Sequence, residues 1–290
     1  MSTSRSPRIS YDRRGNGPPL LLIHGIGHRR EVWQPVIGRL GGRFDVVAVD
    51  LPGFGTSERA SPDVETGPGW LADQVETTMD AVGWSAANLV GNSLGGWIAL
   101  ELARRGRARS VCAFMPAGIW KEGRGADSWR HRAGFALWTN ETRLPGADVA
   151  IRNRVIRTVA LFGLFGRPWR IPPDIAAADT ANLRNSDFGR TMAATRGRRF
   201  TGGDSIPSPV TVVFGTRDPL IRLGETDFAQ LPPQTRIVTR RGLGHVPTWD
   251  DPDFVASTVE ATAALRNAPP RLGRPTPVPS SSANRRAVGR

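Results

Sequence analysis

One serine of this 290-residue chain lies in a setting that would make it a nucleophile. Ser93 is the centre of residues 91–95, Gly-Asn-Ser-Leu-Gly, between a short apolar run and a segment with helical periodicity. A sharp strand-to-helix turn there would lift the serine hydroxyl above the end of the strand, at the positive end of the following helix. The alternative is an ordinary glycine-rich turn in which Ser93 caps the helix. The pattern and its position favour a nucleophile.

A serine hydroxyl is a weak nucleophile and needs a base, so the four histidines of the chain are the candidates. We favour His245, because it follows the last predicted strand in a glycine-rich loop that would lie beside Ser93. Asp218 follows the preceding predicted strand and is the candidate for the acid that orients the base. Asp218 could equally cap a helix ahead of Pro219.

The elements that would position these side chains follow an alternating pattern. Short apolar runs of strand length alternate with segments in which apolar residues share one helical face, and this indicates an α/β fold around a mostly parallel sheet. The predicted strands before residue 118 cover residues 20–23, 44–49, 88–90 and 110–114, and the predicted helices cover residues 70–82 and 97–103. Strands at 210–214 and 236–239 and a helix at 253–265, capped by Asp251, complete the pattern.

The middle of the chain departs from this pattern and suggests a division into parts. Residues 118–205 contain no convincing strand, and prolines break them into short helical segments. We therefore predict a core formed by residues 1–117 and 206–266, interrupted by a helical cap at 118–205. Residues 267–290 are rich in proline, serine and arginine and are predicted to be a disordered basic tail.

Composition excludes several classes of protein. The single cysteine, Cys112, excludes an intramolecular disulfide and a cysteine-rich zinc site. No apolar run is long enough to span a bilayer and no secretory leader is visible, so we expect a cytoplasmic protein without stable membrane insertion, either a monomer or a homodimer. The net charge of +13 raises the question of an anionic partner. We attribute it mainly to a bias toward arginine and expect no nucleic-acid partner, because no nucleic-acid-binding motif is present.

The chain resembles the α/β-hydrolase superfamily over residues 9–266, outside the insertion. Residues 24–27 (His-Gly-Ile-Gly) are similar to its oxyanion loop, residues 50–57 to its D-x-P-G-x-G-x-S turn, and residues 91–95 to its nucleophile elbow. Ser93, Asp218 and His245 also occur in the chain order of its catalytic triad. The resemblance implies an oxyanion hole formed by the backbone N–H groups of Ile26 and Leu94. It also implies a helical cap inserted after strand six, and neither a metal nor an organic cofactor.

The resemblance implies a serine hydrolase that cleaves a small apolar carboxylic ester, or a related acyl compound, through an acyl-enzyme. Dehalogenases and most epoxide hydrolases of this fold need an aspartate where this chain has Ser93. The elbow and Trp249 are also similar to those of C–C bond hydrolases that act on meta-ring-fission dienoates. Their substrate carboxylate is usually bound by an arginine of the cap, and the candidates here are Arg190, Arg196, Arg198 and Arg199. Solvated surface arginines are the simpler interpretation of these residues. A non-catalytic ligand-binding protein is the third alternative, and Trp120 and Trp249 are the candidate substrate-binding residues.

Overall fold

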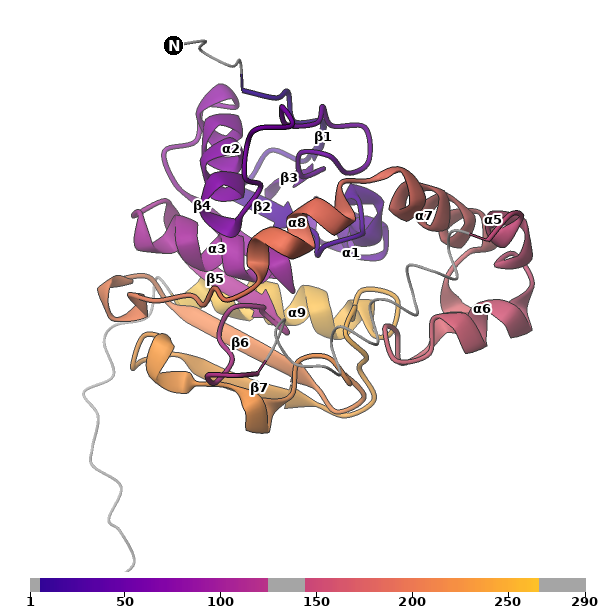
Figure 1. Cartoon of the computed structure of the whole chain (residues 1–290). Coiled ribbons are helices and arrows are strands. Elements are labelled where there is room, and N and C mark those ends of the chain that lie inside the picture. The colour runs from indigo at the N-terminus through magenta and orange to yellow at the C-terminus, as the bar shows by residue number, and fades with distance from the viewer. Residues whose placement is uncertain (1–5, 125–143, 266–290) are drawn as a thin grey trace, which may run out of the picture.

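The computed structural model describes residues 6–124 and 144–265, which form a seven-stranded sheet with helices around it (Figure 1). The strand order is β1-β3-β2-β4-β5-β6-β7, and only β1 runs antiparallel to its neighbour. The strands are β1 (Tyr11–Arg14), β2 (Pro19–Ile23), β3 (Asp45–Val49), β4 (Ala87–Asn92), β5 (Ala108–Phe114), β6 (Val210–Gly215) and β7 (Arg236–Arg240). The predicted α/β fold with a mostly parallel sheet is confirmed.

The first strand was missed by the sequence analysis. All four residues of β1 are exposed, and three of them are charged, so no apolar pattern marks the segment. The strand forms because its backbone pairs with the edge of β3, with Tyr11 opposite Val49. Pairing at a sheet edge depends on backbone groups, which the side-chain pattern does not report.

Helices cover both faces of the sheet. Helices α2 (Pro68–Ala81) and α3 (Leu94–Arg104) pack on each other, as do α1 (Gln34–Leu40) and α9 (Pro252–Ala264), and β5 contacts both α3 and α9. The predicted cap of α9 is present, since the Asp251 side chain accepts a hydrogen bond from the Phe254 amide at 3.1 Å. The 3₁₀ turns are η1 (Arg30–Trp33), η3 (Pro168–Arg170), η4 (Gly203–Ser205), η5 (Leu223–Glu225) and η6 (Phe228–Gln230).

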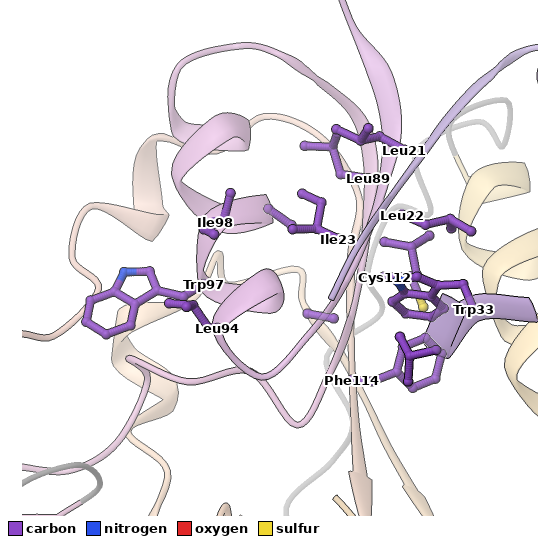
Figure 2. Close-up of a cluster of buried hydrophobic side chains, with 14 of the residues drawn as sticks. Leu21, Leu22, Ile23, Trp33, Leu89, Leu94, Trp97, Ile98, Cys112 and Phe114 are labelled. Carbon is purple, nitrogen blue, oxygen red and sulfur yellow. The ribbon is translucent and has the colours of Figure 1, made fainter. Parts of the chain in front are cut away.

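The core lies on both sides of the sheet (Figure 2). Successive residues of β2 point to opposite faces, so Leu21 and Ile23 pack toward α3 while Leu22 packs near Trp33 and Cys112. This burial raises the pKa of the Cys112 thiol to about 12, which makes it an unreactive core residue.

A helical insertion separates β5 from β6. Its described helices are α5 (Ala147–Ala150), α6 (Arg154–Ala160), α7 (Pro173–Asn185) and α8 (Phe188–Thr195), and Figure 1 shows α5 and α6 at its outer end, away from the sheet. Five described strands precede the insertion, so it follows the fifth strand of this chain and not a sixth. The boundaries 118 and 205 stay predictions. The predicted tail at 267–290 lies outside the described residues.

Candidate active site

Ser93 occupies a sharp turn between β4 and α3. Its φ of 54° is a left-handed value, which among the described non-glycine residues is shared only by Met115. The turn is tight because glycines flank it, and a Cβ atom on Gly95 would overlap the carbonyl oxygen of Ile23. The Ser93 side chain makes no capping hydrogen bond to α3, although the residue stands at the cap position. The helix-capping interpretation of this serine is therefore wrong.

Asp218 and His245 are held together by a buried hydrogen bond. The Nδ1 atom of His245 lies 2.8 Å from Oδ2 of Asp218, and both residues are buried. The second carboxylate oxygen, Oδ1, accepts bonds from the amides of Leu220 at 2.7 Å and Ile221 at 3.1 Å. A proton on Nδ1 that is donated to Asp218 leaves Nε2 of His245 as the acceptor. Asp218 thus holds its own loop through Oδ1 and orients the imidazole of His245 through Oδ2.

Asn92, which the sequence analysis missed, connects the turn at Ser93 to residues 241–247, which carry His245 and which we call the histidine loop. The Nδ2 group of Asn92 donates to the carbonyl oxygen of His245 at 2.8 Å and to that of Phe114 at 3.1 Å. Asn92 immediately precedes Ser93, so one buried amide holds the backbones at both ends of the proposed Ser-His contact. The partners are far apart in the chain, and no local pattern in the sequence reports the contact.

A second missed residue, Asp250, joins the histidine loop to the insertion. Its carboxylate accepts three backbone bonds, from Gly166 at 2.8 Å, Arg167 at 2.7 Å and Gly244 at 2.8 Å. Burial raises the pKa of Asp250, and the three amide donors oppose this shift. Gly244 directly precedes His245, so the Asp250 carboxylate holds the backbone next to the imidazole and connects it to the insertion.

The loop after β2 is held by its histidine, His24. His24 is fully buried, with Nδ1 donating to the carbonyl oxygen of Gly25 at 2.7 Å and Nε2 accepting from the amide of Leu51 at 2.9 Å. Burial lowers the pKa of His24, which keeps the ring neutral. The ring therefore connects residues 24–27 to the turn at residues 50–57.

A narrow apolar cavity of about 40 Å³ lies at this site. Its lining includes Ser93 and His245. It also includes Ile26 and Leu94, which are the expected oxyanion-hole residues, and apolar side chains from the insertion and from the loop after β6. Ile26 and Leu94 make no amide hydrogen bond to another described residue, and Leu94 is the first residue of α3, where helical amides are free. The lining residues are Ile26, Ser93, Leu94, Ala117, Trp120, Met192, Thr195, Leu220, Ile221 and His245.

The two candidate tryptophans have different positions. Trp120 lines the cavity and packs edge-on against Trp97, with ring centroids 5.7 Å apart. Trp249 is not among the lining residues and packs, half-buried, against the core. Of the two candidate tryptophans, Trp120 alone lines this cavity, and the substrate-binding role of both stays a prediction.

A larger and more polar cavity, of about 350 Å³, lies between the turn at residues 53–59 and α7. It contains none of the candidate catalytic residues, so size alone does not identify the active site. Among the residues that the structure describes, no cluster of three or more His, Cys, Asp or Glu side chains could hold a metal ion. No described helix is both long enough and apolar enough to cross a bilayer.

Comparison with known proteins places the chain in a family. The model of the alpha/beta hydrolase family matches residues 20–258. An uncharacterized protein of Mycobacterium tuberculosis is 28% identical, over 97% of this chain and 89% of that protein. A pimeloyl-(acyl-carrier protein) methyl ester esterase of Neisseria meningitidis serogroup C is 30% identical, over 84% of this chain and 90% of the esterase.

A solved structure supports the same fold. The crystal structure of a putative lipase from Acinetobacter baumannii superposes with a TM-score of 0.75 at 20% identity, over 90% of this chain and 89% of that one. Because the family model covers most of the chain, and because the sheet order and the strand-to-helix turn agree with it, this protein belongs to the alpha/beta hydrolase family.

Proposed function

We propose that this protein is a serine esterase that cleaves small apolar carboxylic esters through an acyl-enzyme. The observation that carries the proposal is the buried bond between His245 Nδ1 and Asp218 Oδ2, in a cavity whose wall contains both Ser93 and His245. A base that is oriented by an acid, in a cavity that a serine also lines, is the arrangement that nucleophilic catalysis requires.

The proposed reaction has two halves. Ser93 Oγ attacks the ester carbonyl carbon while His245 takes its proton, and the collapse of the tetrahedral intermediate releases the alcohol, which takes that proton. Water then loses a proton to His245 as it attacks the acyl-enzyme, and release of the acid returns the proton to Ser93. The amides of Ile26 and Leu94 would hold the oxyanion in both halves, and one such donor is worth about 2.7–4 kcal/mol.

The size and lining of the cavity support a short apolar acyl group. Ordinary ligand pockets enclose about 300–1,000 Å³, whereas this cavity is about 40 Å³ and is lined mostly by apolar side chains. Long acyl chains would need displacement of side chains such as Met192 or Leu220. The Neisseria relative is named for a methyl ester, and this is consistent with a small leaving alcohol.

The C–C bond hydrolase alternative is less well supported. No arginine is among the residues that line the described cavity. Arg190 donates to the carbonyl oxygens of residues 60, 61 and 64, Arg198 pairs with Glu65, and Arg199 pairs with Asp227. Among the described residues, the cavity wall therefore offers no cationic partner to a dienoate carboxylate at Ser93.

A series of p-nitrophenyl esters from acetate to palmitate tests the proposal. We expect the highest kcat/KM with the shortest chains, and loss of turnover in Ser93→Ala. Ser257→Ala is the matched control, because Ser257 is an exposed serine on α9 whose hydroxyl bonds only within its own helix. Turnover in Ser93→Ala equal to that of the control would contradict the mechanism. No turnover by a folded wild-type protein would favour the non-catalytic alternative.

A further inference from the structure

The outer end of the insertion carries an unusual concentration of exposed apolar side chains. Of the twelve large hydrophobic side chains that are exposed among the described residues, seven lie between residues 144 and 169. Scattered exposed hydrophobic residues are normal in soluble proteins, but contiguous ones mark an interaction surface. We call these seven residues the apolar cap face: Leu144, Val149, Val155, Ile156, Val159, Phe162 and Trp169.

Helix α6 forms the centre of the apolar cap face. Val155 and Val159 are one helical turn apart and lie on the same side, and their exposed fractions are 71% and 74%. Phe162 follows just beyond the helix and is 70% exposed. The other side of α6 is anchored, because the buried Arg157 donates to the carbonyl oxygens of Ile151 at 3.0 Å and Arg152 at 2.8 Å.

The charges around the apolar cap face are almost all positive. Residues 144–170 contain five arginines and one acid, Asp148. Arg157 is buried, so the four other arginines and Asp148 leave a net charge of +3 that is at least partly exposed. Asp148 is paired with Arg184, and Asp174, just beyond this range, is paired with Arg152. Arg154, on α6 itself, is exposed. A second copy of this surface, or a basic partner, would meet like charges, whereas an anionic partner would be attracted.

We propose that the apolar cap face docks on the surface of an anionic lipid bilayer. Exposed valine, phenylalanine and tryptophan side chains beside arginines are the combination that binds at a membrane interface, where apolar groups enter the acyl boundary and cations contact headgroups. Figure 1 shows α6 at the outer end of the insertion, away from the sheet. This docking is peripheral and needs no membrane-spanning helix. It is also independent of the chemistry at Ser93.

Vesicle flotation with the full-length protein tests this docking. We expect binding to vesicles of equal parts phosphatidylglycerol and phosphatidylcholine at low salt, and at least about tenfold weaker binding to pure phosphatidylcholine, since each arginine near an anionic surface contributes about fivefold. Added salt should weaken the binding. The variant Ser93→Ala should bind as the wild type does, which separates this proposal from the proposed esterase function.

Two triple variants locate the binding surface. Val155→Ser/Val159→Ser/Phe162→Ser should bind anionic vesicles at least about tenfold more weakly, because it removes apolar side chains that would enter the bilayer. Tyr11→Ser/Leu223→Ser/Ile237→Ser is the control, since it removes three exposed apolar side chains outside the insertion. Both variants keep the net charge and residues 266–290, so the arginines of that segment cannot explain a difference between them.

Several results would overturn the proposal. These are no binding of the wild type to anionic vesicles, equal binding to neutral vesicles, and equal loss of binding in both triple variants. Circular dichroism establishes that both variants are folded. If sedimentation instead shows a dimer that is lost only in the α6 variant, a second copy covers this face and the lipid assignment is wrong.

Discussion

Replacing Asp250 with asparagine should impair catalysis through the position of His245. The carboxylate holds three backbone amides with two oxygens: Oδ2 accepts from Gly166 and Gly244, and Oδ1 accepts from Arg167. An asparagine has one acceptor oxygen, so in its best orientation it keeps the two bonds at Oδ2. The NH₂ group of the asparagine then faces the Arg167 N–H, so two hydrogen-bond donors meet with no acceptor between them.

The magnitude follows from the bond that is lost. A hydrogen bond to a charged group contributes about 1.5–3 kcal/mol, and the buried N–H that remains has no acceptor. We expect the free energy of unfolding to fall by roughly this amount. Part of the loss should appear in catalysis, because the opposed donors at Arg167 displace a side chain that also holds Gly244, the neighbour of His245. A tenfold change in rate corresponds to about 1.4 kcal/mol. If about half of the loss appears in the transition state, kcat should fall about three- to tenfold, with a smaller change in KM.

Asp251→Asn is the matched control. Asp251 is the neighbouring carboxylate, but its side chain caps α9 through the Phe254 amide and pairs with Arg240. Only its backbone amide contacts the histidine loop, at the carbonyl oxygen of Pro247, and the substitution leaves that bond in place. Its loss should cost about 1 kcal/mol of stability and leave kcat unchanged. The assays are steady-state kinetics on the best p-nitrophenyl ester, urea unfolding, and amide exchange at Gly244. Equal kcat values in the two variants, with normal protection of Gly244, would refute the positioning role.

Three further predictions concern buried groups. Asp218→Asn should lower kcat by about 10³–10⁴-fold in the ester assay, because His245 would lose the acceptor that selects its tautomer; little change would mean that another acid orients the base. Burial lowers the pKa of His28 to about 3, so the unfolded chain binds a proton below about pH 6.5 that the folded protein does not. Urea unfolding should therefore show about 2 kcal/mol less stability at pH 5 than at pH 7 from this group, and His28→Gln should reduce that difference; an unchanged slope would contradict this. Cys112 should resist iodoacetamide at pH 8 in the native protein and react in urea, and rapid native labelling would show that the core opens.

The sheet and its main helices were predictable because burial gives them a periodic pattern. The strands β2 to β6 are apolar on both faces, and the predicted segments agree with them to within one or two residues at each end. Strand β1 was not predictable, because its side chains are exposed and only backbone pairing with β3 defines it.

The candidate site was predictable where chemistry depends on residue type and chain order, as for Ser93 and His245. The residues that support it were not, because Asn92 and Asp250 act on backbone groups of distant segments. Such contacts impose no sequence pattern near either partner. Trp249, four residues after His245, stays a prediction as a substrate contact, and the structure shows its side chain packed on the core.

The close contact between residues 164–166 and the histidine loop limits how caps can be exchanged between relatives. A Cβ atom on Gly166 would overlap the carbonyl oxygen of Gly242, and the amide of Val246 donates to the carbonyl oxygen of Leu164 at 2.8 Å. A cap transplanted from another hydrolase must therefore bring a glycine at this point, together with the backbone path that leads to it. Chimeras that instead keep residues 164–167 with this core can exchange the segments on either side.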